Sequence, residues 1–136
     1  PFVGRAGKLL DKMIAALGML RKEVYICNAV KCRPPNNRTP GVDEIEVCSP
    51  FLFRQLEAIH PDVICALGLT AAQTLLGAGI PMSRLRGRAH YWRGIPVVCT
   101  YHPAYLLRTP AQKAATWQDL LAVDRILRGQ TDATSR

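Results

Sequence analysis

Two polar residues stand where apolar runs of the chain end. Asn28 follows the run 24–27 and His102 follows the run 95–100. An Asn side chain presents an acceptor beside a donor, which matches the N3–H and O4 of uracil and mismatches cytosine. A His side chain could donate to a pyrimidine O2 that becomes negative as a base departs. Spacing alone favours ordinary roles, in which Asn28 satisfies backbone groups at a strand end and His102 is a turn histidine.

The cysteines fall into two groups. There are five, with no C-x-x-C spacing and no secretory signal pattern, which argues against a disulfide framework and favours a reducing cytosol. Cys27, Cys65 and Cys99 lie inside apolar runs, where a thiol acts as a small buried hydrophobe. Cys32 and Cys48 stand among polar residues and prolines, where burial for packing is a poor explanation of a thiol.

The charge balance favours a polyanionic partner. Eighteen Lys and Arg against ten Asp and Glu give a formal charge of +8, and most of the surplus is arginine, whose planar fork suits phosphate. The arginines of "RLRGRAHYWR", Arg86 among them, and Arg108 cluster near the apolar run 95–100, so we expect them to contact phosphate. The alternative is a basic surface with no ligand.

Hydrophobic spacing and breaker residues predict the elements that position these side chains. We expect helices over residues 6–17, from Pro40 toward Ile59 with Pro50 breaking or kinking it, over 71–76 with Thr70 as cap, and from Thr109 to Gly129. We expect strands over residues 23–30, 62–67 and 95–100, and a disordered tail over 130–136.

Strands separated by helices predict an α/β fold, in which a parallel sheet is covered on both faces. The ligand site of such folds lies outside the carboxyl ends of the strands. The residues that follow the three predicted strands are Asn28, Gly68 with Thr70, and His102. The candidate side chains are therefore expected at one edge of the sheet.

The length of 136 residues suits one domain, and no run of eighteen apolar residues predicts a membrane span. The chain opens on Pro1 rather than on methionine, which suggests a piece of a longer protein.

Four ordered blocks carry a resemblance that spans residues 1 to 128. "PFVGRAGKLL", "VYICNAVKCRPPNNRTP", "CSPFLFRQLEAIHPDVICALG" and "TYHPAYLLR" resemble successive blocks of the family 4 uracil-DNA glycosylases, the iron-sulfur branch. The resemblance implies a three-layer α/β/α sandwich on a parallel sheet of four strands, one more than the sequence shows. It also implies a glycosylase-like domain over residues 1–129 that is incomplete at its N-terminus.

The resemblance assigns roles residue by residue. Phe2 is similar to the aromatic residue that stacks on the flipped uracil, and Asn28 to the amide that reads its edge. His102 resembles the catalytic histidine at the uracil O2. Leu106 is similar to the leucine wedge that enters the duplex. Cys32 and Cys48 resemble the second pair of ligands to a 4Fe-4S cluster.

Two family features are missing before Pro1: a C-x-x-C that gives the first two cluster ligands, and an acidic block that positions water. We therefore expect either a truncated chain or a degenerate relative, with little activity of its own.

The implied activity is hydrolysis of the N-glycosidic bond of deoxyuridine in single- or double-stranded DNA. The enzyme is expected to be cytoplasmic and nucleoid-associated, to be a monomer when full length, and to have no membrane partner. The alternatives are a superfamily member acting on another deaminated base and a non-catalytic DNA-binding module. A zinc protein using Cys27, Cys32 and Cys48 with a histidine fits no finger spacing.

Overall fold

The computed structural model describes residues 4–27, 42–77 and 79–129. Along this part of the chain the elements are, in order, α1 (Gly4–Ala16), η1 (Arg21–Glu23), α2 (Val42–Ile59), β1 (Ile64–Leu67), α3 (Leu69–Leu76), α4 (Met82–Leu85), β2 (His90–Trp92), β3 (Ile95–Thr100), α5 (Pro103–Arg108), η3 (Pro110–Gln112) and α6 (Lys113–Leu127). None of the helices described is long and apolar enough to cross a membrane.

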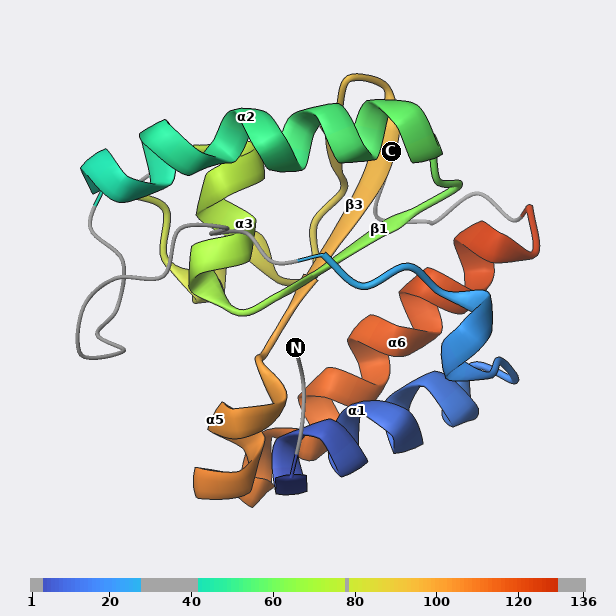
Figure 1. Ribbon diagram of the computed structural model, residues 1–136. Coiled ribbons are helices and arrows are strands. Elements are labelled where there is room, and N and C mark those ends of the chain that lie inside the picture. The colour runs from blue at the N-terminus through green and yellow to red at the C-terminus, as the bar shows by residue number, and fades with distance from the viewer. Residues whose placement is uncertain (1–3, 28–41, 78, 130–136) are drawn as a thin grey trace.

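The elements form the α/β architecture that the alternation of strands and helices predicted. Figure 1 shows α2 and α3 on one face of the sheet and α1, α5 and α6 on the other. One core cluster lies on the α2 and α3 side and includes Leu52, Leu56 and Trp92. On the other side, Leu10 of α1, Leu106 of α5 and Leu120 of α6 are buried.

The sheet has three strands in the described part of the chain, in the order β1-β3-β2. β1 pairs with β3 in parallel, so that Leu67 lies opposite Thr100, as expected for strands joined through helices. The prediction of an all-parallel sheet was wrong, because β2 pairs with β3 in the antiparallel direction. β2 was not predicted as a strand, since residues 86–93 were interpreted only as the segment that precedes β3.

The β2–β3 hairpin follows from two residues. Arg93 and Gly94 both have positive φ, 49° and 84°, and they connect Trp92 to Ile95, which face each other across the ladder. Two positive φ angles are typical of the type I′ turn, whose twist matches that of antiparallel strands.

The strand predicted over residues 23–30 is wrong in its described part. Residues 21–23 form η1, and residues 24–27 form no strand; the remainder lies outside the described residues. An apolar run becomes a strand only where another backbone completes its hydrogen bonds. In Figure 1 this segment runs as an extended chain without forming a strand.

The helix boundaries required three corrections. α2 continues through Pro50 rather than breaking there. α3 begins one residue before Thr70, and its N-cap is Gly68; Thr70 instead accepts a hydrogen bond at its carbonyl from Oγ1 of Thr74. α5 was not predicted as a helix, and η3 separates it from α6.

Candidate active site at the carboxyl ends of β1 and β3

Gly68 and His102 meet where the two parallel strands end. Gly68 follows β1 directly, and its N–H donates a 2.8 Å hydrogen bond to the carbonyl of Thr100, the last residue of β3. His102 lies two residues beyond Thr100. The edge that the sequence predicted as a ligand site therefore brings these two residues together, as parallel strand ends should.

His102 is the N-cap of α5. Its backbone is extended (φ −67°, ψ 140°), and Pro103 occupies the first helical position. Nδ1 of the ring accepts a 3.0 Å hydrogen bond from the N–H of Ala104. An Nδ1 that accepts carries no proton, so the neutral ring has its proton on Nε2. The local helix start thus selects one tautomer of His102.

The surroundings of His102 also favour its neutral form. Burial, and then the positive charge of Arg108, lower the pKa of His102 below its usual value of 6.5. Both effects penalise the imidazolium. At neutral pH the ring is therefore an uncharged donor through Nε2.

Gly68 allows the close approach of His102. Its φ is +92°, a conformation that side chains disfavour, and a Cβ placed there would lie 3.1 Å from Cβ of His102. The glycine therefore leaves space that the side chain of His102 occupies.

Leu106 does not suit the predicted wedge role. Its side chain is 1% exposed and packs inside the layer of helices below the sheet. A wedge must reach a duplex outside the protein, so this position requires a correction. Leu107, in the same turn of α5, is half-buried.

Arg86 was predicted to contact phosphate, and the structure places its guanidinium against protein instead. Nε lies 2.8 Å from Oδ2 of Asp119, whose side chain is 5% exposed. Burial opposes the charge of Arg86, but the hydrogen bonds and charge of Asp119 outweigh it and raise its pKa. The fork therefore already holds a carboxylate, and this geometry gives no support to the predicted phosphate contact at Arg86.

The other arginines of this segment are either paired with protein groups or exposed. Arg93 forms an ion pair with Glu57 and lies over the ring of Trp92. Arg84 and Arg88 are exposed, as is Arg108 at the end of α5.

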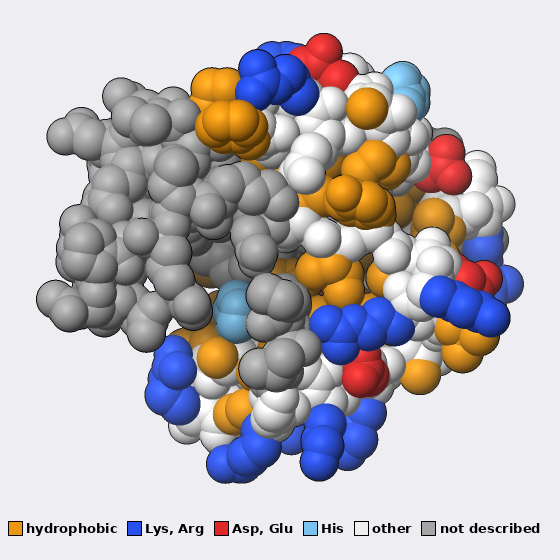
Figure 2. All heavy atoms as spheres, in the orientation of Figure 1, with side chains coloured by type: hydrophobic (Ala, Val, Ile, Leu, Met, Phe, Trp, Pro, Cys, Tyr) orange, Lys and Arg blue, Asp and Glu red, His pale blue; other side chains and the backbone are white. Residues whose placement is uncertain are grey.

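A basic surface that sequence reasoning missed lies on α1. Arg5, Lys8 and Lys12, here called the α1 basic stripe, are all exposed. Their i, i+3, i+7 spacing places them on one face of the helix, opposite the buried Leu10 and Ile14. This spacing was the available signal. Figure 2 shows Lys and Arg side chains gathered over its lower half, where α1, α5 and α6 lie in Figure 1.

The side chains of four predicted site residues lie outside the described part of the structure. Phe2, Asn28 and Cys32 lie outside the described residues. The backbone of Cys48 belongs to α2, but its side chain lies outside the described part. Among the side chains described, no three His, Cys, Asp or Glu gather as a metal site.

The described cysteines include two that suit packing rather than ligation. Loss of hydration, followed by the charge of Asp119, raises the pKa of Cys65 to about 12 and that of Cys99 to about 11. Metals bind the thiolate, which such thiols rarely form.

Comparison with known proteins places the chain in a family. The family model of the uracil DNA glycosylase superfamily matches residues 1–121, and the chain belongs to that superfamily. Within it, the chain is 51% identical over 110 residues to the type-4 uracil-DNA glycosylase of Thermotoga maritima, which covers 79% of this chain and 57% of the relative. The type-4 enzyme of Archaeoglobus fulgidus is 46% identical over 118 residues, covering 81% and 59%.

A third type-4 uracil-DNA glycosylase, from Pyrobaculum aerophilum, is 43% identical over 128 residues, covering 88% of this chain and 65% of the relative. The chain thus spans less than two thirds of the length of these three curated relatives.

Proposed function

We propose that this chain carries the uracil-releasing site of an enzyme that acts on DNA by hydrolysing the N-glycosidic bond of deoxyuridine. The observation that carries the proposal is the state of His102, a neutral ring whose Nδ1 accepts from Ala104 and whose proton lies on Nε2. Superfamily membership and similarity to type-4 uracil-DNA glycosylases support the choice of substrate.

The proposed role of His102 is to stabilise the departing base. As the glycosidic bond lengthens, negative charge grows on the uracil, including its O2. A hydrogen bond from Nε2–H to O2 strengthens with that charge, so it stabilises the transition state more than the bound substrate. The main-chain contact at Nδ1 orients the donor before the substrate arrives.

Recognition of the base is proposed for two residues outside the described part. Phe2 would stack on uracil, a contact worth about 1 to 3 kcal/mol. Asn28 would pair with N3–H and O4 of the base. Extrusion of the uracil from a duplex costs a few kcal/mol, less at a mismatch or in a single strand.

DNA contacts are proposed for the surface around α5. The α1 basic stripe and Arg108 would hold phosphates, since α1 packs against α5. Leu107, half-buried in the same turn as Leu106, would take the wedge role that burial denies to Leu106.

We also propose that Cys32 and Cys48 are ligands of a 4Fe-4S cluster. The high pKa values of Cys65 and Cys99 make those two thiols poor alternatives. When bound, such a cluster would brace the segment that carries Asn28.

The test is release of uracil from an oligonucleotide containing one deoxyuridine, as a single strand and opposite guanine. His102→Ala should slow release about 10²- to 10³-fold, as loss of one oxyanion donor does. Binding of the oligonucleotide should change little, because the bond forms fully only in the transition state. His60→Ala is the matched control, since His60 is exposed at the end of α2.

Other outcomes would reject the proposal in different ways. Release of hypoxanthine but not uracil from matched oligonucleotides would assign another deaminated base. Tight binding with no release of either base would favour the non-catalytic DNA-binding alternative.

A further inference from the structure

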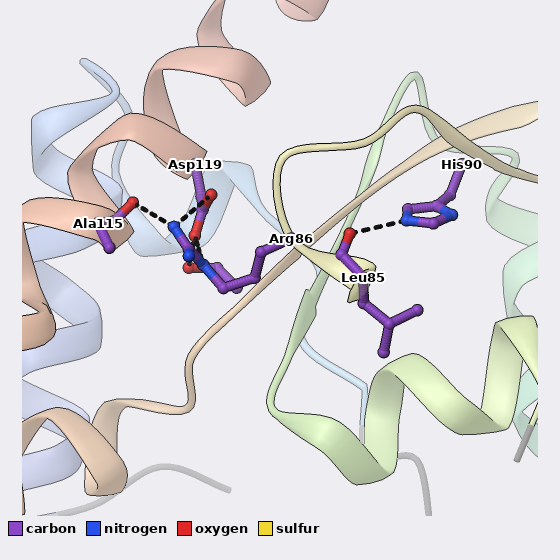
Figure 3. Close-up of polar contacts among 6 residues, drawn as sticks. Leu85, Arg86, His90, Ala115 and Asp119 are labelled. Atoms are coloured by element: carbon purple, nitrogen blue, oxygen red, sulfur yellow. Dashed lines mark hydrogen bonds and ion pairs between the residues drawn. The ribbon is translucent and has the colours of Figure 1, made fainter. Parts of the chain in front are cut away.

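Arg86 and Asp119 form a two-pronged ion pair between distant segments. Nε of Arg86 donates to Oδ2 of Asp119 at 2.8 Å, and Nη2 donates to Oδ1 at 3.1 Å. Nη2 also donates to the carbonyl of Ala115 at 3.0 Å. Figure 3 shows the guanidinium directed at α6 from the segment after α4. This pairing geometry restrains both partners in orientation as well as distance.

The residue before Arg86 is held from the other side. Nε2 of His90 lies 2.7 Å from the carbonyl of Leu85 (Figure 3). A carbonyl can only accept, so His90 donates. Leu85 itself is fully buried. The backbone just before Arg86 is therefore bonded to β2, while the guanidinium at the end of its side chain is bonded to α6.

Asp119 extends the connection to the strand that leads to His102. Oγ1 of Thr100 donates to Oδ2 of Asp119 at 2.6 Å. Thr100 is the last residue of β3 and is fully buried. One carboxylate therefore joins α6, Arg86 and the end of β3, two residues before the histidine.

Arg86 also supports the residue between Thr100 and His102. Its guanidinium carbon lies 4.9 Å from the ring centroid of Tyr101. Tyr101 stacks on Tyr105, with centroids 4.8 Å apart and planes at 29°. The N–H of Tyr105 donates to the carbonyl of His102 at 3.0 Å. The contacts thus hold the chain on both sides of His102.

We infer that the Arg86–Asp119 pair is a positioning device for His102, which holds the end of β3 and the first turn of α5 so that Nε2–H faces the departing base. This inference rests on the proposed function. Neither residue of the pair needs to touch the substrate. The choice of charged partners supports a positional role, because apolar side chains of similar volume often serve stability equally well in such buried places.

The variants are chosen to break one contact at a time. Asp119→Asn keeps the shape of the side chain and removes its charge. Thr100→Val keeps the shape of Thr100 and removes the hydroxyl that reaches Asp119. Glu57→Gln is the matched control, since it makes the same carboxylate-to-amide change in the Arg93–Glu57 ion pair.

The first readout is the ring of His102 itself, by ¹⁵N NMR of histidine-labelled protein. The sequence has only three histidines, so the signals can be assigned by substitution. The parent should show the Nε2–H tautomer of His102. Asp119→Asn and Thr100→Val should mix the tautomers as the contact from Ala104 loosens, whereas Glu57→Gln should leave the ring signals unchanged.

The second readout is single-turnover release of uracil beside DNA affinity. A small misplacement of a catalytic group can cost about 10²-fold in rate, so Asp119→Asn should slow release by about 10- to 100-fold with nearly parental binding. Thermal unfolding of each variant separates this loss from general destabilisation.

The outcomes decide separately on the inference and on the proposed function. Parental His102 signals in Asp119→Asn and Thr100→Val would make the pair purely structural and overturn the inference. If Asp119→Asn fails to fold, Thr100→Val and Arg86→Lys carry the same comparison. If neither this chain nor a version extended upstream by a C-x-x-C and an acidic block releases uracil, the proposed function is rejected, while the NMR comparison would still decide whether the pair positions the ring.

Discussion

A side chain at residue 68 would point at His102. A Cβ placed on Gly68 would lie 3.1 Å from Cβ of His102. Gly68→Ala should therefore move the histidine by a few tenths of an ångström as well as strain the backbone, whose φ is +92°. Such strain costs about 1 to 3 kcal/mol of stability. We expect slower uracil release, measured in single turnovers, together with a lower melting temperature.

Gly77→Ala separates the two effects. Gly77 has a φ of +114°, and a Cβ placed on it would meet no atom within 4 Å, so alanine there adds strain without touching the site. It should lower the melting temperature and leave the rate of release unchanged. Equal slowing in both variants would mean that the contact with His102 has no catalytic importance.

The charge of Arg108 should add to burial in extending activity to lower pH. Burial and then Arg108 lower the pKa of His102, so the neutral donor persists to a lower pH than an ordinary histidine would allow. Arg108→Gln removes one cause and should raise this pKa. The acid limb of the pH–rate profile should then move to higher pH, in step with an NMR titration of His102.

The control for charge alone is Arg54→Gln, because Arg54 is exposed on α2 and lies over Phe51. It should leave the titration of His102 in place. A shift equal to that of Arg108→Gln would assign the effect to net charge rather than to proximity.

The α1 basic stripe should appear in the salt dependence of DNA binding. Each phosphate neutralised on a duplex adds about 0.9 to the slope of log K against log salt. Changing Arg5 and Lys8 together to Gln should therefore reduce the slope by about 1.8. Binding isotherms at several salt concentrations measure it.

Arg128→Gln removes an arginine that is already paired with Asp124 on α6, and it should change the slope much less. If the stripe variant keeps the parental slope, the DNA lies elsewhere and α1 is an uninvolved surface.

Iron content should depend on two cysteines and not on a third. A version extended upstream by a C-x-x-C, prepared anaerobically, should contain iron that Cys32→Ser and Cys48→Ser reduce. Cys65→Ser should retain it, because a thiol whose pKa is raised to about 12 seldom forms the thiolate that iron binds. Metal analysis and the visible spectrum give the answer, and stoichiometric zinc in place of iron would contradict the cluster assignment.

Local patterns predicted the elements whose signals lie within a few residues. β3 was predicted with its observed bounds, because the turn at Arg93 and Gly94 precedes a continuous apolar run. His102 was expected at the carboxyl end of that strand, where it is found. The apolar run 24–27 gave an equally strong signal and forms no strand, since strand pairing is decided by a distant partner.

Long-range pairing also explains why the ion pair of Arg86 was not predicted. Its partner Asp119 lies 33 residues further along the chain, so no local spacing connects them. From sequence alone, an arginine in a basic segment suggests a phosphate contact. Only the fold shows that a carboxylate lies beside it. Leu106 was assigned the wedge role for a similar reason, because motif position gives no information about which side of α5 faces the core.

The two-residue turn between β2 and β3 has a consequence for the order of folding. Closing so short a loop loses little chain entropy and takes microseconds, whereas β1 can pair with β3 only after the intervening helices have been folded back. We expect the hairpin to form first and to present β3 as a ready edge for β1. Folding and unfolding rates of a Trp92→Phe variant should give a φ-value well above that of Ala66→Gly in β1; the reverse order would show that Gly68 and His102 come together before the hairpin exists.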